Sequence, residues 1–160
     1  MHSVSLRKIS FDELLPRIRW AFADDPELET HYHIAAGTGV DLAEHTFTGL
    51  GEYKDVGGMQ PYEVVLEVNG WHIPIGFTVI LHEPDGSGGL EYSLLMSFGI
   101  HIRCREWAIL EPWLQAVREE IGRDKWAVPL YPRNTRAINF FQRQGFKLED
   151  TGDFTLLLWQ

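Results

Sequence analysis

The chain has 160 residues, with 14 Lys and Arg against 23 Asp and Glu, which gives a formal net charge of −9. This length fits one domain, so we expect residues 1–160 to form a single folded unit. A hydrophobic content of 44% and a charged content of 23% exclude a disordered or low-complexity chain. An acidic protein is also a poor non-specific ligand for nucleic acids and anionic membranes, so we expect neither as a partner.

Cysteine usage and hydropathy favour a soluble cytoplasmic protein. The one cysteine, Cys104, cannot form an internal disulfide, which is typical of a reducing compartment. The nearly apolar run 92–102 is too short to cross a bilayer, and residues 1–10 do not contain an apolar stretch of signal-peptide length.

The charge is unevenly distributed along the chain. Residues 1–100 hold 5 basic and 15 acidic side chains, a net charge of −10, whereas residues 101–160 hold 9 and 8, a net charge of +1. A site for an anionic ligand is therefore expected after residue 100.

The first elements are a strand over 4–9 and an amphipathic helix over 11–23. Ser10 and Glu13 form a capping box, in which the hydroxyl and the carboxylate each satisfy a backbone N–H of the first turn. Pro16 lies inside the helix and is expected to kink it or to delay its start.

A three-stranded antiparallel meander is predicted next. Residues 24–61 contain six glycines and predict one or two short helices. Strands over 62–68 and 71–81 flank Asn69-Gly70, the preferred two-residue hairpin turn, and a third long strand is predicted over 90–102.

The C-terminal third alternates helix and strand. A helix over 105–121 ends at Gly122, and the strand over 126–131 contains Pro129, which cannot donate to a ladder and indicates an unpaired side.

Asn134 is a good N-cap for the last helix, which runs to about residue 144 and is followed by a hairpin of strands over 146–149 and 154–159. The whole order predicts an α+β fold, with a mixed, mostly antiparallel central sheet and helices on both faces.

One C-terminal segment is specific enough to suggest a family. Residues 134–146 read Asn-Thr-Arg-Ala-Ile-Asn-Phe-Phe-Gln-Arg-Gln-Gly-Phe. This segment resembles the pattern Asn-x-x-Ala-x-x-(Leu/Phe)-Tyr-x-x-x-Gly-Phe of the GNAT superfamily of N-acetyltransferases, and the order of elements is similar over nearly the whole chain. The resemblance implies a sheet whose fourth and fifth strands splay apart to admit the acyl-pantetheine arm of acetyl-CoA, a gap that Pro129 would tolerate.

The resemblance also implies a pyrophosphate site at the start of the helix predicted over 105–121. Residues 103–108 stand where the family has a (Gln/Arg)-x-x-Gly-x-(Gly/Ala) loop, and a helix N-terminus beside arginines attracts an anion. Asn134 would contact the cofactor arm. Glu106 replaces the central glycine, and its carboxylate would oppose a phosphate by about 1 kcal/mol. Arg103 and Ala108 match the first and last positions of the loop, and the candidate cofactor-binding residues that it implies are Arg103, Cys104, Arg105, Trp107 and Ala108.

The resemblance to the GNAT superfamily also suggests a catalytic acid and a catalytic base. Glu91, twelve residues before Arg103, resembles the glutamate that takes the amine proton in several family members. The tyrosine that protonates the departing thiolate in many members is replaced by Phe141, so Tyr131 at the end of the short strand is the substitute candidate.

Other chemistries are weaker alternatives. Cys104 lies between two arginines, which would lower its thiol pKa, but a structural cysteine is favoured because no histidine partner can be assigned. Trp107 and Trp113 are expected to be core residues rather than cofactor-stacking ones. A metal site is conceivable but less favoured than solvated loop residues, and its candidate ligands are Glu29, His31, His33, Glu44 and His45.

The sequence therefore predicts an acyl-CoA-dependent N-acyltransferase that moves acetyl from acetyl-CoA to a primary amine. Residues 101–147 hold 9 basic and 5 acidic groups, net +4, and residues 24–61 hold 1 and 8, net −7. An acidic rim would face a cationic acceptor, either a small molecule or a protein lysine or N-terminus. The alternative is a catalytically degenerate binding or structural protein of the same fold, for example a bacteriophage component. A homodimer is compatible with either function.

Overall fold

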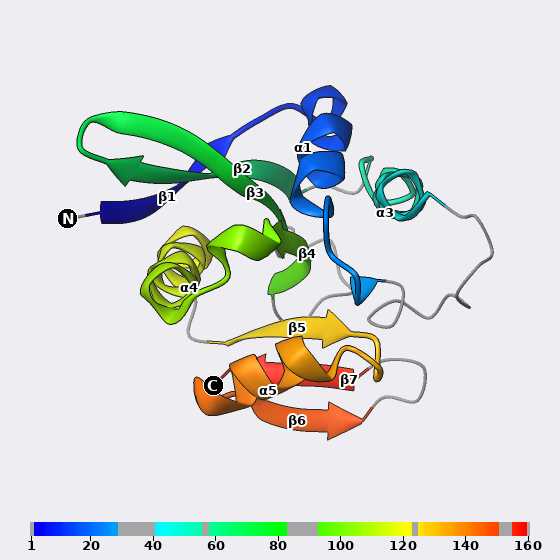
Figure 1. Ribbon diagram of the computed structural model, residues 1–160. Coiled ribbons are helices and arrows are strands. Elements are labelled where there is room, and N and C mark those ends of the chain that lie inside the picture. The colour runs from blue at the N-terminus through cyan, green and yellow to red at the C-terminus, as the bar shows by residue number, and fades with distance from the viewer. Residues whose placement is uncertain are drawn as a thin grey trace.

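One mixed sheet of seven strands forms the centre of the protein (Figure 1). The computed structural model describes residues 2–28, 41–55, 58–82, 93–122, 125–150 and 155–159. The strand order across the sheet is β1-β2-β3-β4-β5-β7-β6, and all neighbours are antiparallel except β4 and β5, which are parallel. The strands are β1 (His2–Lys8), β2 (Met59–Val68), β3 (Trp71–Leu81), β4 (Ser93–Ile100), β5 (Trp126–Leu130), β6 (Lys147–Asp150) and β7 (Thr155–Trp159).

Helices cover both faces of this sheet, which confirms the predicted fold class. Two separate apolar clusters show this arrangement: one joins the first two helices to β3, and the other joins the last two to the strands on the opposite face. The helices are α1 (Leu14–Ala21), α3 (Leu42–Gly51), α4 (Trp107–Ile121) and α5 (Thr135–Arg143).

The fourth and fifth strands diverge after two residue pairs. Ser93 pairs with Trp126 and Leu94 with Ala127, and the ladder ends there although β4 continues to Ile100. β5 goes on to pair with β7 along its whole length. Because the strands are parallel, their carboxyl ends lie on the same side of the sheet, where they separate. The predicted splay is confirmed.

Local sequence signals fix most element ends. Ser10 and Glu13 form the predicted capping box, and a 3-10 turn precedes α1, so Pro16 delays the α-helix rather than breaking it. Asn69 and Gly70 both have positive φ, 49° and 82°, as a two-residue hairpin turn of type I′ requires.

The end of β4 differs from the sequence prediction. The strand stops at Ile100, and residues 102–104 form a 3-10 turn in which the Cys104 N–H donates to the His101 carbonyl at 2.8 Å. Glu106 is still extended, so α4 begins at Trp107 rather than at 105. A hydrophobic run alone did not reveal this turn, because Ile102 is half-buried and Cys104 packs against the core, as strand residues would.

Two glycines allow β3 and β4 to approach closely. A Cβ added to Gly76 would collide with the carbonyl oxygen of Gly99, and one added to Gly99 would lie 2.8 Å from the Phe77 ring. The neighbouring atoms are backbone and core, so they cannot move away without disturbing the sheet.

We expect Gly76→Ala to lower the free energy of unfolding by about 1–3 kcal/mol, because the extra methyl group overpacks the β3–β4 pair. Gly49→Ala is the matched control: nothing lies within 4 Å of its added Cβ, and it occupies a helix interior. That substitution should instead stabilise by about 0.5–1 kcal/mol. Urea denaturation of both variants measures the difference, and equal stability of Gly76→Ala and the wild type would contradict the predicted collision.

Candidate functional site

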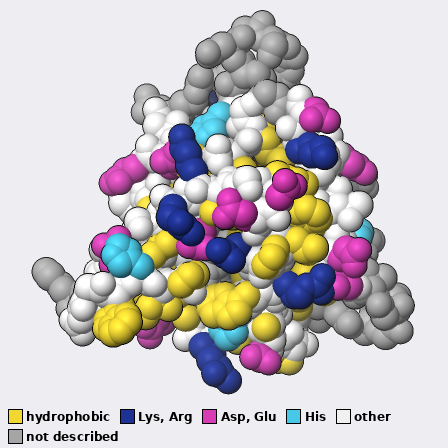
Figure 2. All heavy atoms as spheres, turned by 90° about the horizontal axis from the view of Figure 1, so that it is seen from above, with side chains coloured by type: hydrophobic (Ala, Val, Ile, Leu, Met, Phe, Trp, Pro, Cys, Tyr) yellow, Lys and Arg dark blue, Asp and Glu magenta, His cyan; other side chains and the backbone are white. Residues whose placement is uncertain are grey.

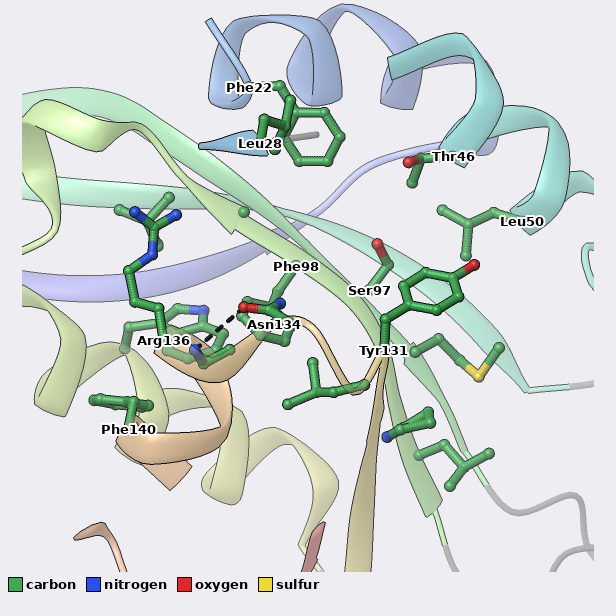
Figure 3. Close-up of a pocket in the computed structure, with 18 of the residues that line it drawn as sticks. Phe22, Leu28, Thr46, Leu50, Ser97, Phe98, Tyr131, Asn134, Arg136 and Phe140 are labelled. Atoms are coloured by element: carbon green, nitrogen blue, oxygen red, sulfur yellow. Dashed lines mark hydrogen bonds between the residues drawn. The ribbon is translucent and has the colours of Figure 1, made fainter. Parts of the chain in front are cut away.

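A cleft of about 940 Å³ occupies the gap between the splayed strands (Figure 3). The cleft is lined from both faces of the sheet, because each splayed strand and the helices on either side contribute side chains. β4 and β5 contribute Met96, Ser97, Phe98, Pro129, Leu130 and Tyr131 with the adjoining turn. The face covered by α4 and α5 contributes Arg105, Trp107, Asn134, Arg136 and Phe140, and α3 with the turn after it contributes His45, Thr46, Leu50, Glu52 and Tyr53.

A β-bulge distorts β4 beside the cleft. Val79 pairs with Ser97 and Ile80 with Leu95, so Met96 is the extra residue of β4. From Leu95 onward the edge of β4 that faces β5 runs along the cleft instead of forming a ladder. Backbone N–H and C=O groups on such an edge suit an extended ligand that carries amide groups.

One face of α5 lines the wall of the cleft opposite the β4 edge. Asn139, Phe140 and Arg143 follow Arg136 by three, four and seven residues, which places all four on the same side of the helix. The Asn134 side chain caps this helix, and its Oδ1 accepts a hydrogen bond from the Ala137 N–H at 3.2 Å (Figure 3).

A buried carboxylate connects three segments at the mouth of the cleft. Asp25, which follows α1, accepts hydrogen bonds at Oδ2 from Arg105 Nη1 at 2.7 Å and from Arg136 Nη2 at 3.0 Å. Its side chain is 0% exposed, whereas those of Arg105 and Arg136 are 17% and 43% exposed. Arg105 also donates from Nε to the Ile100 carbonyl at 2.6 Å, which fixes its guanidinium.

The arginines decide the charge state of Asp25. Burial by itself raises the pKa of this carboxyl, but the hydrogen bonds from Arg105, from the Glu27 N–H and from Arg136 outweigh it, and the pKa is lowered from 3.8. Asp25 therefore stays ionised and neutralises part of the positive charge at this mouth.

A second contact holds the same loop in place. His101 Nδ1 accepts a hydrogen bond from the Arg103 N–H at 3.2 Å, and its Nε2 lies 3.9 Å from Asp24 Oδ2. Asp24 has a positive φ of 62°, an uncommon conformation for a residue with a side chain. The turn after α1 is thus hydrogen-bonded to the β4–α4 loop at Asp25, and Asp24 lies close to the same loop.

The predicted cofactor residues divide into two groups. Arg105, Trp107 and Asn134 line the cleft. Arg103 and Ala108 are exposed and Cys104 is half-buried, and none of these three is among the cleft-lining residues. Their role in binding a phosphate stays a prediction.

Two sequence interpretations of this loop are wrong. The pKa of the Cys104 thiol is raised, not lowered, because the side chain is partly buried and the Glu106 carboxylate lies nearby. Trp107 is not a core residue: 45% of it is exposed and its ring centroid lies 5.5 Å from that of Phe140 at the cleft. Trp113 does belong to the core.

Of the two predicted catalytic residues, the structure describes the acid, Tyr131, but not the base, Glu91. Glu91 lies outside the described residues. Tyr131 lines the cleft just after β5, and its ring extends toward the side where Ser97 and Leu50 lie (Figure 3). Phe141 is fully buried in an aromatic cluster, with ring centroids 5.6 Å from Phe98 and 5.1 Å from Phe146.

The metal alternative gains no support from the described residues. Within them, no group of three or more His, Cys, Asp or Glu side chains converges to hold an ion. Glu29, His31 and His33 lie outside this part of the chain, and His45 lines the cleft. None of the described helices combines the length and apolar character of a membrane span.

Sequence reasoning missed most of the residues that shape the cleft. The intervals of three, four and seven among Arg136, Phe140 and Arg143 are visible in the sequence and could have identified the lining face of α5. α3 carries no comparable signal, because its lining residues are a mixture of polar, apolar and aromatic types.

We expect Asp25→Asn to lower the free energy of unfolding by about 1–3 kcal/mol at pH 7, because two arginines lose a charged acceptor. The pKa of Asp25 is lower in the folded protein than the ordinary 3.8. Its stabilising contribution is therefore complete above pH 3.8 and is lost as the pH falls through the folded-state pKa.

Urea denaturation at several pH values down to 3 checks this prediction. The difference from the wild type should shrink as the pH falls below 3.8, while the exposed Asp55→Asn control shows little difference at any pH. A pH-independent difference for Asp25→Asn would show that the effect is not electrostatic.

Comparison with known proteins gives structural but not sequence relatives. No family model and no curated protein matches the chain. An acetyltransferase from Thermus thermophilus is similar with a TM-score of 0.68 at 20% identity, covering 99% of this chain and 97% of that one.

Two further structures extend the comparison. A probable acetyltransferase of the GNAT family from Chromobacterium violaceum gives a TM-score of 0.66 at 13% identity, covering 98% of this chain and 81% of that one. A PaiA N-acetyltransferase from Thermoplasma acidophilum in complex with coenzyme A gives 0.57 at 15%, covering 99% of each chain. Together with the splayed strands, these similarities show that the chain has the fold of the GNAT acetyltransferases.

Proposed function

We propose that this protein is an acyl-CoA-dependent N-acyltransferase that transfers an acetyl group from acetyl-CoA to a primary amine. The observation that carries the proposal is the cleft through the splayed strands, which is lined from both faces of the sheet. A donor and an acceptor can enter such a cleft from opposite sides and meet between β4 and β5.

The α5 face is the donor side in this proposal. Arg105, Arg136 and Arg143 line the cleft there, Asp25 pairs with Arg105 and Arg136, and Glu27 lies 3.6 Å from Arg136, so these five groups have a formal net charge of +1. Such a group attracts the phosphates of a nucleotide thioester. The PaiA structure in complex with coenzyme A shows that a protein with this fold binds the molecule.

The chemistry that acetyl-CoA supplies is an activated thioester. The edge of β4 beyond Leu94 would hold its amide-containing arm, and the bulge at Met96 bends the strand locally at this point. Tyr131 would donate a proton to the departing thiolate, and Glu91 would take the proton of the amine, directly or through water. Glu106 is exposed at the N-cap of α4 and would adjoin the phosphates as a repulsive charge.

A non-catalytic binding protein of the same fold, such as a bacteriophage component, is the second candidate. Phe141 favours it, because a buried phenyl ring stands where many family members have an acidic hydroxyl. Glu106 favours it as well, since the carboxylate weakens a phosphate site. The two candidates differ in catalysis: the enzyme would release thiol from acetyl-CoA over many turnovers, whereas the binding protein would not.

We expect acetyl-CoA at 100 times its Kd to stabilise the protein by about 2.7 kcal/mol, measurable as a rise in Tm. Arg105→Ala and Arg136→Ala should each reduce this stabilisation, because both guanidinium groups line the cleft. Arg103→Ala, measured separately, tests the exposed arginine of the predicted phosphate loop. Lys147→Ala, an exposed residue of β6, is the control and should leave the shift unchanged. An unchanged Tm at millimolar acetyl-CoA would reject the proposed function.

We expect Tyr131→Phe to lower kcat by about 100-fold or more while the KM for acetyl-CoA changes little, because the variant loses a general acid but keeps the ring. Release of free thiol from acetyl-CoA measures the rate. Tyr62→Phe is the matched control: its hydroxyl donates to Glu120 Oε1 at 2.8 Å, and the residue is not among those that line the cleft. Equal kcat values for Tyr131→Phe and the wild type would remove Tyr131 from the chemistry.

A further inference from the structure

We infer that the donor site binds a straight aliphatic acyl group of about four to six carbons more tightly than acetyl, on the α3 side of the cleft. The inference rests on the proposed function and specifies its donor. It is carried by the length of the cleft along β4 and by the side chains at its two ends. The transfer step is the same for every chain: the C–S bond breaks, a C–N bond to the amine forms, and the proton that the amine loses ends on the sulfur.

The basic end of the cleft lies at the carboxyl end of β4. Arg105 donates from Nε to the carbonyl of Ile100, the last residue of the strand, at 2.6 Å. Asp25 Oδ2 accepts hydrogen bonds from both Arg105 and Arg136, so the second guanidinium is held close to the first. If these arginines bind the phosphates of the donor, its acyl-pantetheine arm begins beside Ile100.

Apolar side chains line the other end, where the β4–β5 ladder closes the gap at Leu94. Leu81 pairs directly with Leu94 in the β3–β4 ladder, so their side chains share one face of the sheet. Val79, two residues before Leu81, belongs to the apolar cluster that contains Leu50 of α3, so this face is the one that α3 covers. Met96 packs against the same cluster. We call the four lining residues Leu50, Leu81, Leu94 and Met96 the acyl pocket.

The distance between the two ends exceeds the length of the arm. From Ile100 back to Leu94 the strand extends over about 20 Å, at about 3.3 Å per residue. The close-up of the cleft shows Arg136 and Leu50 on opposite sides of the view (Figure 3). From phosphate oxygen to sulfur, the arm has as many chain atoms as about four amino-acid residues and spans about 14 Å. The sulfur would therefore lie near Met96, and the remaining length of about 6 Å suits a chain of about four to six carbons, whereas acetyl fills about half of it.

The composition of the acyl pocket favours an aliphatic chain. Its four side chains are aliphatic or thioether groups, and each methylene group of a ligand that is buried against such groups strengthens binding about four-fold. A carboxylate at the end of the chain would lie against side chains that offer it no hydrogen-bond donor, which weakens binding. The acyl pocket therefore distinguishes donors by the length and the polarity of their acyl group.

A second apolar hollow lies outside the cleft. It is a groove of about 460 Å³ between α1 and β3, and its lining includes Trp20, Ile73 and Pro74. On the face seen in Figure 2, hydrophobic side chains likewise gather between basic and acidic ones. None of the described residues lines both the groove and the cleft, so the groove serves as a control for non-specific binding of an aliphatic chain.

Calorimetric titration with a series of acyl-CoA thioesters tests the inference and does not require the identity of the amine. We expect butyryl-CoA and hexanoyl-CoA each to bind at least about ten-fold more tightly than acetyl-CoA, because the added methylene groups are buried. Octanoyl-CoA should bind no more tightly than hexanoyl-CoA, since its chain exceeds the acyl pocket. Succinyl-CoA, which matches butyryl-CoA in chain length but ends in a carboxylate, should bind no more tightly than acetyl-CoA. Equal or weaker binding of butyryl-CoA and hexanoyl-CoA would overturn the inference.

Variants of Leu94, a half-buried residue, locate the chain. Leu94→Phe fills the acyl pocket, so hexanoyl-CoA and acetyl-CoA should then bind within about two-fold of each other. Leu94→Ala enlarges the pocket and should make octanoyl-CoA the tightest ligand of the series. The matched control is Leu66→Phe, because Leu66 is a half-buried strand leucine that is not among the cleft-lining residues. This variant and Ile73→Ala in the groove should both keep the wild-type ratio of Kd values.

The outcomes separate this inference from the proposed function. If acetyl-CoA binds and the longer chains bind no more tightly, this inference fails and the proposed function stands. If no acyl-CoA of the series binds, both fail together. A gain with chain length that persists in Leu94→Phe but is lost in Ile73→Ala would place the chain in the groove and overturn the inference.

Discussion

The early end of the β4–β5 ladder is the constraint on which the candidate site depends. Two residue pairs join the strands, and beyond Leu94 and Ala127 each continues without the other. The sheet tolerates this opening because β5 pairs with β7 along its whole length and β4 pairs with β3. Beyond this point the backbone edge of β4 that would otherwise pair with β5 can bind a ligand.

Side chains from distant parts of the sequence stabilise the edges of this opening. Asp25 brings the segment after α1 to Arg105 of the β4–α4 loop and to Arg136 of α5. The Asp25 carboxylate is fully buried and the Arg105 side chain is 17% exposed, so this pair is better protected from water than the pair with Arg136, which is 43% exposed. This arrangement connects the proposed donor side with the helix layer on the acceptor side.

The distribution of charge in the sequence corresponds to side chains at the cleft in the C-terminal half, and in part in the segment 24–61. The basic excess after residue 100 correctly indicated arginines at the cleft, in the β4–α4 loop and on α5. The acidic excess over 24–61 predicted an acidic rim, and in the described part of that segment Asp25 and Asp41 are held in ion pairs while Glu52 lines the cleft. The net charge of a sequence segment counts its ionisable residues, whereas the electrostatics of a binding site depend on which of those side chains lie at the site and which are ion-paired.

Short-range signals were reliable because their physical cause is local. The hairpin at Asn69-Gly70, the cap at Asn134 and the left-handed Gly145, with a φ of 99°, depend on backbone conformation within a few residues. The exposure of Trp107 and the raised pKa of Cys104 were predicted wrongly, because both depend on which segments pack around the loop.

The sequence by itself determined the order of elements, most of their ends and the motif on α5, since periodicity, turn residues and caps act over a few residues. Tertiary structure alone decided the lining of the cleft. Thr46 of α3 and Glu52 at its C-cap become cleft residues because α3 packs beside the splayed strands, and Arg136 finds its partners Asp25 and Glu27 more than 100 residues away in the sequence. Those contacts arise from packing across the sheet, which no local pattern of residues encodes.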